Sequence, residues 1–184
     1  MRLFCTVVRL RQMIRILSGI AIFAFAAVAQ VQEPQYLDAF YAAGTNGHLV
    51  ELERQTIAFR SHMKLLPGYG SFTMNGEVRP GQSPVRLGAT PQFVILGRAP
   101  IDPSLRFELR SLKASKRTRE LVIARGHGTV FGAASSTEDG AIPLRFENYG
   151  DASYRITPTQ ALTPGEYALE TRGVIATIYC FGVD

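Results

Sequence analysis

Apolar and polar residues alternate with a period of two along much of the chain. In the segment 57–65, Ile57, Phe59, Met63 and Leu65 share one parity, and the residues between them are mostly polar or basic. Similar alternation recurs over 105–110 and 142–147. This period is typical of β-strands that bury one face. We therefore expect a half-buried strand in each of the three segments.

Two further segments, 93–96 and much of 174–183, are apolar at consecutive positions. Such runs are typical of central strands that are covered on both sides. Short turn signals separate the apolar segments, among them Pro67-Gly68, Asn75-Gly76 and Gly150-Asp151. Many short strands with frequent turns, and no stripe of helical period, predict an all-β antiparallel sandwich.

The segment from Leu162 to Leu169, Leu-Thr-Pro-Gly-Glu-Tyr-Ala-Leu, resembles the turn and penultimate strand of immunoglobulin-like sandwiches. In that fold a tyrosine near the strand start fixes the corner by hydrogen bonding to the backbone, and the resemblance implies this role for Tyr167. Leu169 stands where antibody domains have a cysteine, which implies packing in place of the inter-sheet disulfide. Phe40-Tyr41 and the segment 47–53 are similar to segments of uncharacterised exported bacterial proteins.

The chain begins with the pattern of a secretory signal peptide. Four arginines precede an uncharged apolar run at 16–29, which ends in Ala-Val-Ala and is short for a membrane span. We expect a signal peptide at 1–29, an N-terminal β-hairpin layer at 30–78 and the immunoglobulin-like β-sandwich at 79–184. The alternative to a cleaved signal peptide is an uncleaved N-terminal anchor. The sequence leaves two points open: whether translation starts at Met1 or Met13, and whether 30–78 packs as a separate unit.

Signal cleavage changes the charge of the chain. The formal net charge of +5 comes from 20 Lys and Arg against 15 Asp and Glu, and four of the basic residues lie before residue 30. The remaining 155 residues therefore hold 16 basic and 15 acidic side chains. This balance argues against a nucleic-acid partner. The expected location is periplasmic or secreted, with no transmembrane segment after cleavage, and Cys180 is the only remaining cysteine, so no internal disulfide is expected.

One short segment concentrates positive charge between two alternating stretches. It is expected to form a hairpin tip, and its cations are Arg110, Lys113, Lys116, Arg117 and Arg119. Such a tip suits anionic lipid head groups, lipopolysaccharide phosphates or an acidic protein partner. The alternative is a solvated turn whose charges discourage edge-to-edge aggregation.

Metal chemistry has little support in the residue spacing. His48, His62 and His127 are far apart in sequence and are expected to lie on the surface. Cys180 with Met63 or Met74 offers ligand types that suit copper, but Cys180 falls on an apolar strand face, which favours a buried and inert thiol.

The periplasmic copper-resistance carriers share the Pro-Gly-x-Tyr turn. In this chain Arg172-Gly173-Val174 replaces the Asp-Gly-His segment that follows it in those carriers, so the resemblance implies the fold and no copper ligands. No metal ligand and no cofactor are predicted.

The sequence predicts no catalytic residue. Ser61 and Lys64 have the spacing of a Ser-x-x-Lys motif, but alternation predicts a strand, which places them on opposite faces. The pairs Glu51 with Glu53 and Glu166 with Glu170 are expected on the solvent side of strands.

The function that the sequence favours is that of an exported, non-catalytic binding or structural component of the cell envelope. Its partner is an unknown protein or envelope component, and its oligomeric state is left open. A periplasmic metal-handling protein, for copper or zinc, is the alternative.

Overall fold

The computed structural model describes residues 32–44, 46–97, 102–129, 132–137, 140–173 and 176–184. The predicted signal peptide, residues 1–29, lies outside the described residues. The described chain is all-β apart from one 3-10 turn, η2 (Pro103–Leu105). All strand pairs are antiparallel except one, which joins β6 (Arg86–Leu87) to β15 (Thr177–Val183). The predicted all-β sandwich is confirmed.

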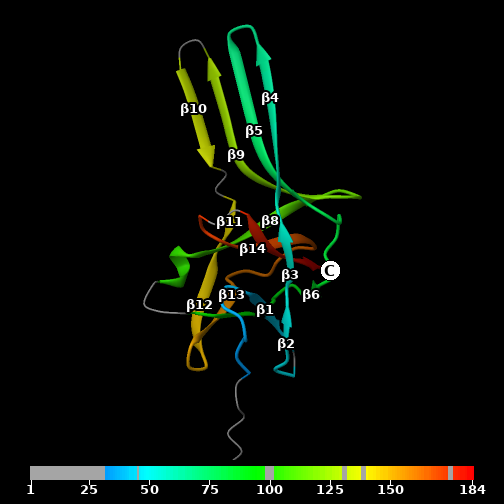
Figure 1. Cartoon of the computed structure of the whole chain (residues 1–184), viewed down its shortest axis with the longest axis vertical. Coiled ribbons are helices and arrows are strands. Elements are labelled where there is room, and N and C mark those ends of the chain that lie inside the picture. The colour runs from blue at the N-terminus through cyan, green and yellow to red at the C-terminus, as the bar shows by residue number, and fades with distance from the viewer. Residues whose placement is uncertain (1–31, 45, 98–101, 130–131, 138–139, 174–175) are drawn as a thin grey trace, which may run out of the picture. The chain divides into compact units, whose positions relative to one another are not determined.

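Two sheets form the sandwich (Figure 1). The first has the order β12 (Leu144–Tyr149), β13 (Ser153–Pro158), β7 (Phe93–Leu96), β1 (Phe40–Ala43) and β2 (Leu49–Glu51). The second has the order β3 (Glu53–Thr56), β15, β14 (Gly165–Thr171) and β8 (Phe107–Ala114), and continues into β9 (Arg119–Thr129), β5 (Tyr69–Val78) and β4 (Ala58–Leu66). Two short strands attach to it, β10 (Gly132–Thr137) beside β9 and β11 (Ala141–Ile142) beside β8.

The main core lies between the two sheets and is rich in aromatic rings. Phe93 of β7 packs on Phe181 of β15 with ring centroids 4.9 Å apart, and Phe40 of β1 packs edge-on to Phe107 of β8 at 5.3 Å. Such tilted and edge-on pairs stabilise a core beyond simple burial. The prediction of central, fully covered strands is confirmed for β7 and for the described part of 174–183.

A second apolar cluster lies on the other face of β14 and β15. It contains Ala168 and Cys180 of these strands together with Val78 of β5 and Leu121 of β9. β8 and β9 pair only at the positions next to their turn, whereas β9 pairs with β5 along its whole length. The ends of β5 and β9 that contain Val78 and Leu121 thus form a third layer over the sandwich. For this reason β14 and β15 are buried on both faces.

The described residues before position 79 do not pack as a separate unit, because Val31–Asp184 forms one compact unit. β1 and β2 pair within the first sheet, and β3 pairs with β15 in the second. Leu52, which is fully buried, lies where the chain passes from one sheet to the other. The hairpin of β1 and β2 is part of the first sheet, and the hairpin of β4 and β5 continues the second sheet through β9.

Two of the predicted turns are confirmed and one is wrong. Gly68 and Gly150 have positive φ at the turns that follow β4 and β12, a conformation that favours glycine. Asn75 and Gly76 instead lie within β5. A side chain at position 76 would collide with Ile57, so the glycine is required for close packing rather than for a turn.

β4, β5, β9 and β10 extend side by side beyond the sandwich (Figure 1). We call residues 58–75, 124–129 and 132–137 of these strands the arm. The sequence predicts a half-buried strand at 57–65, and the strand is present, but all nine residues of β4 are exposed. The prediction of burial is therefore wrong. Alternation shows which residues share a face and carries no information on whether another layer covers it.

Candidate functional site

The basic segment forms the predicted hairpin between β8 and β9. The turn is closed by a hydrogen bond that the amide of Ser115 donates to the carbonyl of Thr118, at 2.8 Å. Lys113, Lys116 and Arg117 are exposed at or beside this turn. These three cations remain available to an anionic partner.

The prediction that Arg110 and Arg119 share this surface is wrong. Arg119 is fully buried and donates to both carboxylate oxygens of Glu53, at 2.8 and 3.0 Å, and to the carbonyl of Pro80 at 2.9 Å. Arg110, whose side chain is about one-tenth exposed, donates to the carbonyl of Val122 at 2.6 Å and lies 3.4 Å from Glu170. Arg110 is enclosed because the third layer covers this face of the second sheet, and Arg119 is enclosed because it lies on the inner side of that layer, at the start of β9.

Glu166 and Glu170 are buried for the same reason, so their predicted place on the solvent side is wrong. Glu166 accepts hydrogen bonds from Arg86 at 2.5 Å and from the amide of Ser83 at 2.9 Å. Burial raises the pKa of Glu170, against the opposing charge of Arg110. The carboxylates of Glu53 and Glu166 are thus held by cations and amides, and their role is to join the layers.

The thiol of Cys180 is fully buried. Burial raises its pKa to about 12, although the positive charge of Arg119 acts in the opposite direction. A thiol with this pKa is neither a nucleophile nor a ready metal ligand at physiological pH. The prediction that Cys180 is buried is confirmed.

The three histidines, His48, His62 and His127, are exposed, as predicted. Among the residues that the structure describes, no group of three or more His, Cys, Asp or Glu is placed to hold a metal ion. Ser61 and Lys64 both lie in β4, where their spacing puts them on opposite faces of the strand.

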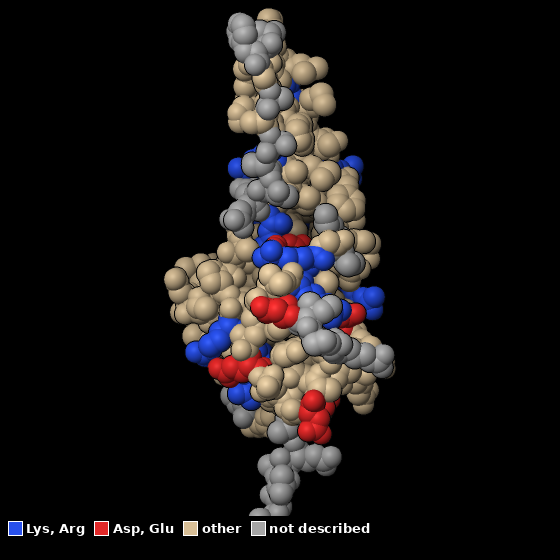
Figure 2. Space-filling model, turned by 90° about the vertical axis from the view of Figure 1, so that its left-hand side faces the viewer, with Lys and Arg blue, Asp and Glu red and all other residues tan. Residues whose placement is uncertain are grey.

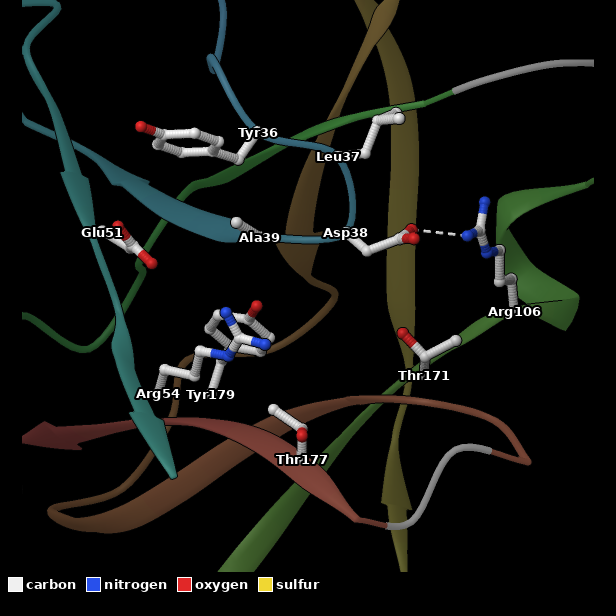
Figure 3. A pocket seen from close by; sticks show the side chains of 10 residues that line it. All are labelled: Tyr36, Leu37, Asp38, Ala39, Glu51, Arg54, Arg106, Thr171, Thr177 and Tyr179. Atoms are coloured by element: carbon white, nitrogen blue, oxygen red, sulfur yellow. Dashed lines mark hydrogen bonds and ion pairs between the residues drawn. The ribbon is translucent and has the colours of Figure 1, made fainter. Parts of the chain in front are cut away.

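A polar pocket of about 560 Å³ opens beside β1, β3 and β15 (Figure 3). Asp38 and Arg106 face each other across it in an ion pair of 2.5 Å, and Glu51 and Arg54 add one charge of each sign. Burial raises the pKa of Tyr179 in its wall, so this phenol stays protonated at neutral pH. The opposite charges balance, and the pocket favours no particular ionic ligand.

The arm carries most of the large apolar side chains that are exposed in the described part of the chain. Ten large apolar side chains are exposed in the described part of the chain, and six of them belong to the arm: Phe59, Met63, Leu65, Leu66, Tyr69 and Phe72. Met63, Leu65 and Leu66 are 71%, 76% and 65% exposed. Contiguous apolar surface of this kind marks interaction sites in soluble proteins.

The strand register assigns these side chains to the two faces of the arm. Met63 stands directly opposite Phe72, and Leu65 opposite Gly70, on one face. Leu66 stands opposite Tyr69 on the other face. The free end of the β4–β5 hairpin, next to Pro67-Gly68, is therefore apolar on both sides.

Glycines shape the first of these faces. Gly126 of β9 lies beneath the ring of Phe72, and any larger residue there would overlap that ring. Nearby, a hollow of about 290 Å³ is bordered by Met63, Leu65 and Phe72, with Gly70 and Gly128 also in its lining. The face is therefore an apolar surface with a shallow recess.

The sequence carries one signal of the arm, which the predicted strands do not explain. Leu65 and Leu66 are adjacent apolar residues that break the alternation just before a Pro-Gly turn. A half-buried strand is expected to be apolar on one face only, whereas a strand end that binds on both sides is expected to be apolar on both.

Comparison of the chain with family models, with curated proteins and with solved structures finds no match. No helix in the described ranges is long and apolar enough to cross a membrane. The site therefore has to be interpreted from its own geometry and chemistry.

Proposed function

We propose that this protein is an exported, non-catalytic β-sandwich that binds a component of the cell envelope through its arm. The observation that carries this proposal is the exposure of six large apolar side chains on strands that extend beyond the sandwich. Leaving such residues in water is unfavourable, and a binding partner that covers them compensates for it.

Two further observations support the proposal. The carboxylates of Glu53 and Glu166 and the thiol of Cys180 are enclosed by the fold, which favours structural roles for these groups. The hydroxyl of Tyr167 donates to the carbonyl of Thr163 at 2.7 Å, which supports kinship with immunoglobulin-like sandwiches, a group that commonly serves in binding. Export rests on the charged, apolar and small-residue order of residues 1–29.

The proposal predicts that the leader is removed. Expressed in a bacterial host with its own N-terminus, the exported chain is expected to begin near Gln30 because Ala27-Val28-Ala29 fits a signal peptidase site. Intact-mass measurement of the exported protein tests this. Recovery of residues 1–29 in a membrane-bound product would contradict export as a processed protein.

The proposal also predicts that the arm retains the processed protein in the envelope. We expect Met63→Ser with Leu65→Ser to move most of the chain from the envelope fraction to the soluble exported fraction, because the substitutions remove the apolar contact without disturbing a core. Cell fractionation and immunoblotting measure this distribution. Leu105→Ser is the matched control, since Leu105 is 66% exposed and lies on η2. Equal retention of both variants would rule out the arm as the binding surface.

A further inference from the structure

We propose that the free end of the arm inserts into the interfacial region of an anionic lipid bilayer. This inference rests on the proposed function and names the partner. Leu65 lies on one face of the hairpin end, and Leu66 and Tyr69 lie on the other. A protein that docks on a sheet covers one face and leaves the other in water, whereas a bilayer surrounds an inserted tip on both.

The charges of the arm match an anionic surface. The segments 58–75, 124–129 and 132–137 contain Arg60, Lys64 and Arg125 and no Asp or Glu. Figure 2 agrees, since red acidic residues are absent from the upper end of the visible face and gather on the lower part. Basic residues next to a membrane gain binding energy from anionic head groups, and acidic residues would oppose it.

The spacing of the residues along the strand fits the layers of a bilayer interface. A strand rises about 3.3 Å per residue, so the backbone at Lys64 lies about 7 Å behind Leu66. Interfacial segments bury their apolar side chains about 5–10 Å into the boundary between head groups and acyl chains. With Leu65 and Leu66 at this depth, the side chain of Lys64 reaches the phosphates of the lipid head groups. Tyr69 at the hairpin end has an amphipathic ring, which is favoured at the interface between membrane and water.

A second copy of the chain is the competing partner, because β4 is an edge strand of nine residues. Symmetric antiparallel pairing of two β4 strands about His62 would place Arg60 opposite Lys64 of the second copy. Cations directly opposite each other are destabilising, and a basic edge discourages such pairing. The charges that oppose a dimer are those that favour an anionic lipid surface.

Vesicle flotation of the purified exported protein tests the inference, with intact mass used first to confirm that the leader is absent. We expect binding to vesicles of equal parts phosphatidylcholine and phosphatidylglycerol, and much weaker binding to pure phosphatidylcholine. Leu65→Ser with Leu66→Ser is expected to weaken binding by about tenfold or more, because two apolar side chains no longer enter the lipid. Leu105→Ser, at an exposed leucine outside the arm, is expected to bind like the wild type.

A pair of charge variants locates the contact. Lys64→Gln with Arg125→Gln is expected to weaken binding to the anionic vesicles by about tenfold. Lys116→Gln with Arg117→Gln, at the exposed turn between β8 and β9, is expected to leave binding unchanged. Loss of binding in the second pair alone would overturn the inference and place the lipid contact at that turn.

Other outcomes also overturn the inference. Vesicle binding that is insensitive to the leucine substitutions would exclude insertion of the tip. Sedimentation that shows a dimer lost in Leu65→Ser with Leu66→Ser, without vesicle binding, would identify a second copy as the occupant. Arm-dependent retention in the cell envelope without vesicle binding would sustain the proposed function and reject lipid as its partner.

Discussion

Arg119→Leu is expected to lower the free energy of unfolding by about 3–5 kcal/mol, the usual cost of removing one partner from a buried ion pair. Arg119 is fully buried, and it donates one hydrogen bond to each carboxylate oxygen of Glu53 and supplies the positive charge beside them. Without it, Glu53 stays between the layers with its charge uncompensated. Urea unfolding of the variant, followed by circular dichroism, measures the loss.

Two control variants separate the ion pair from general damage to the fold. Glu53→Leu with Arg119→Leu is expected to be more stable than Arg119→Leu alone, because no unpaired charge is then buried. Lys116→Ala, at the exposed turn nearby, is expected to change stability by less than about 0.5 kcal/mol. If Arg119→Leu were as mild as Lys116→Ala, the pair would not hold the layers together.

The same pair has a dependence on pH. Burial pushes the pKa of Glu53 upward, but the hydrogen bonds from Arg119 and other donors outweigh it and lower the pKa. Stability from a carboxyl with a lowered pKa is fully present above the pKa of the unfolded chain and is lost as the pH falls through the folded value. The difference in the free energy of unfolding between the wild type and Arg119→Leu is therefore expected to shrink as the solution is acidified below the ordinary pKa of glutamate.

The sandwich was predictable because its signals are local. Apolar residues at consecutive positions in 93–96 are explained by a central strand, and Gly68 is explained by a turn that requires positive φ. Cys180 was correctly predicted to be buried because its strand is apolar on both faces. Each of these inferences depends on a residue and its near neighbours in the sequence.

The third layer was not predictable because it depends on contacts between distant segments. Glu166 and Arg119 have the appearance of surface residues in the sequence, yet β5 and β9 cover the face of β14 that carries Glu166, and Arg119 at the start of β9 lies 3.6 Å from it. β4 has the alternation of a half-buried strand, yet it is the edge of a sheet that extends past the sandwich. Polarity and spacing describe the faces of a strand, and only the tertiary arrangement decides which faces are covered.

The corner at Tyr167 supplies the second large effect. The ring of Tyr167 is buried and stacks on Phe181 with centroids 5.6 Å apart, and its hydroxyl donates to the carbonyl of Thr163. Tyr167→Ala is expected to cost roughly 3–5 kcal/mol because it leaves a cavity in the main core. Tyr167→Phe keeps the ring and loses one hydrogen bond, so a cost of about 0.5–1.5 kcal/mol is expected.

Glu147 serves as the reference position for this series, and the buried Glu166 next to Tyr167 does not. Glu166 is buried and bonded to Arg86, so its substitution is itself expected to destabilise the fold, whereas Glu147 is exposed on β12. Glu147→Ala is expected to change stability by less than about 0.5 kcal/mol. Denaturant unfolding of these variants should rank Tyr167→Ala well above Tyr167→Phe, and Tyr167→Phe above Glu147→Ala. Equal stability of Tyr167→Ala and Glu147→Ala would show that the corner does not stabilise the sandwich, and the proposed kinship with immunoglobulin-like domains would lose its main structural support.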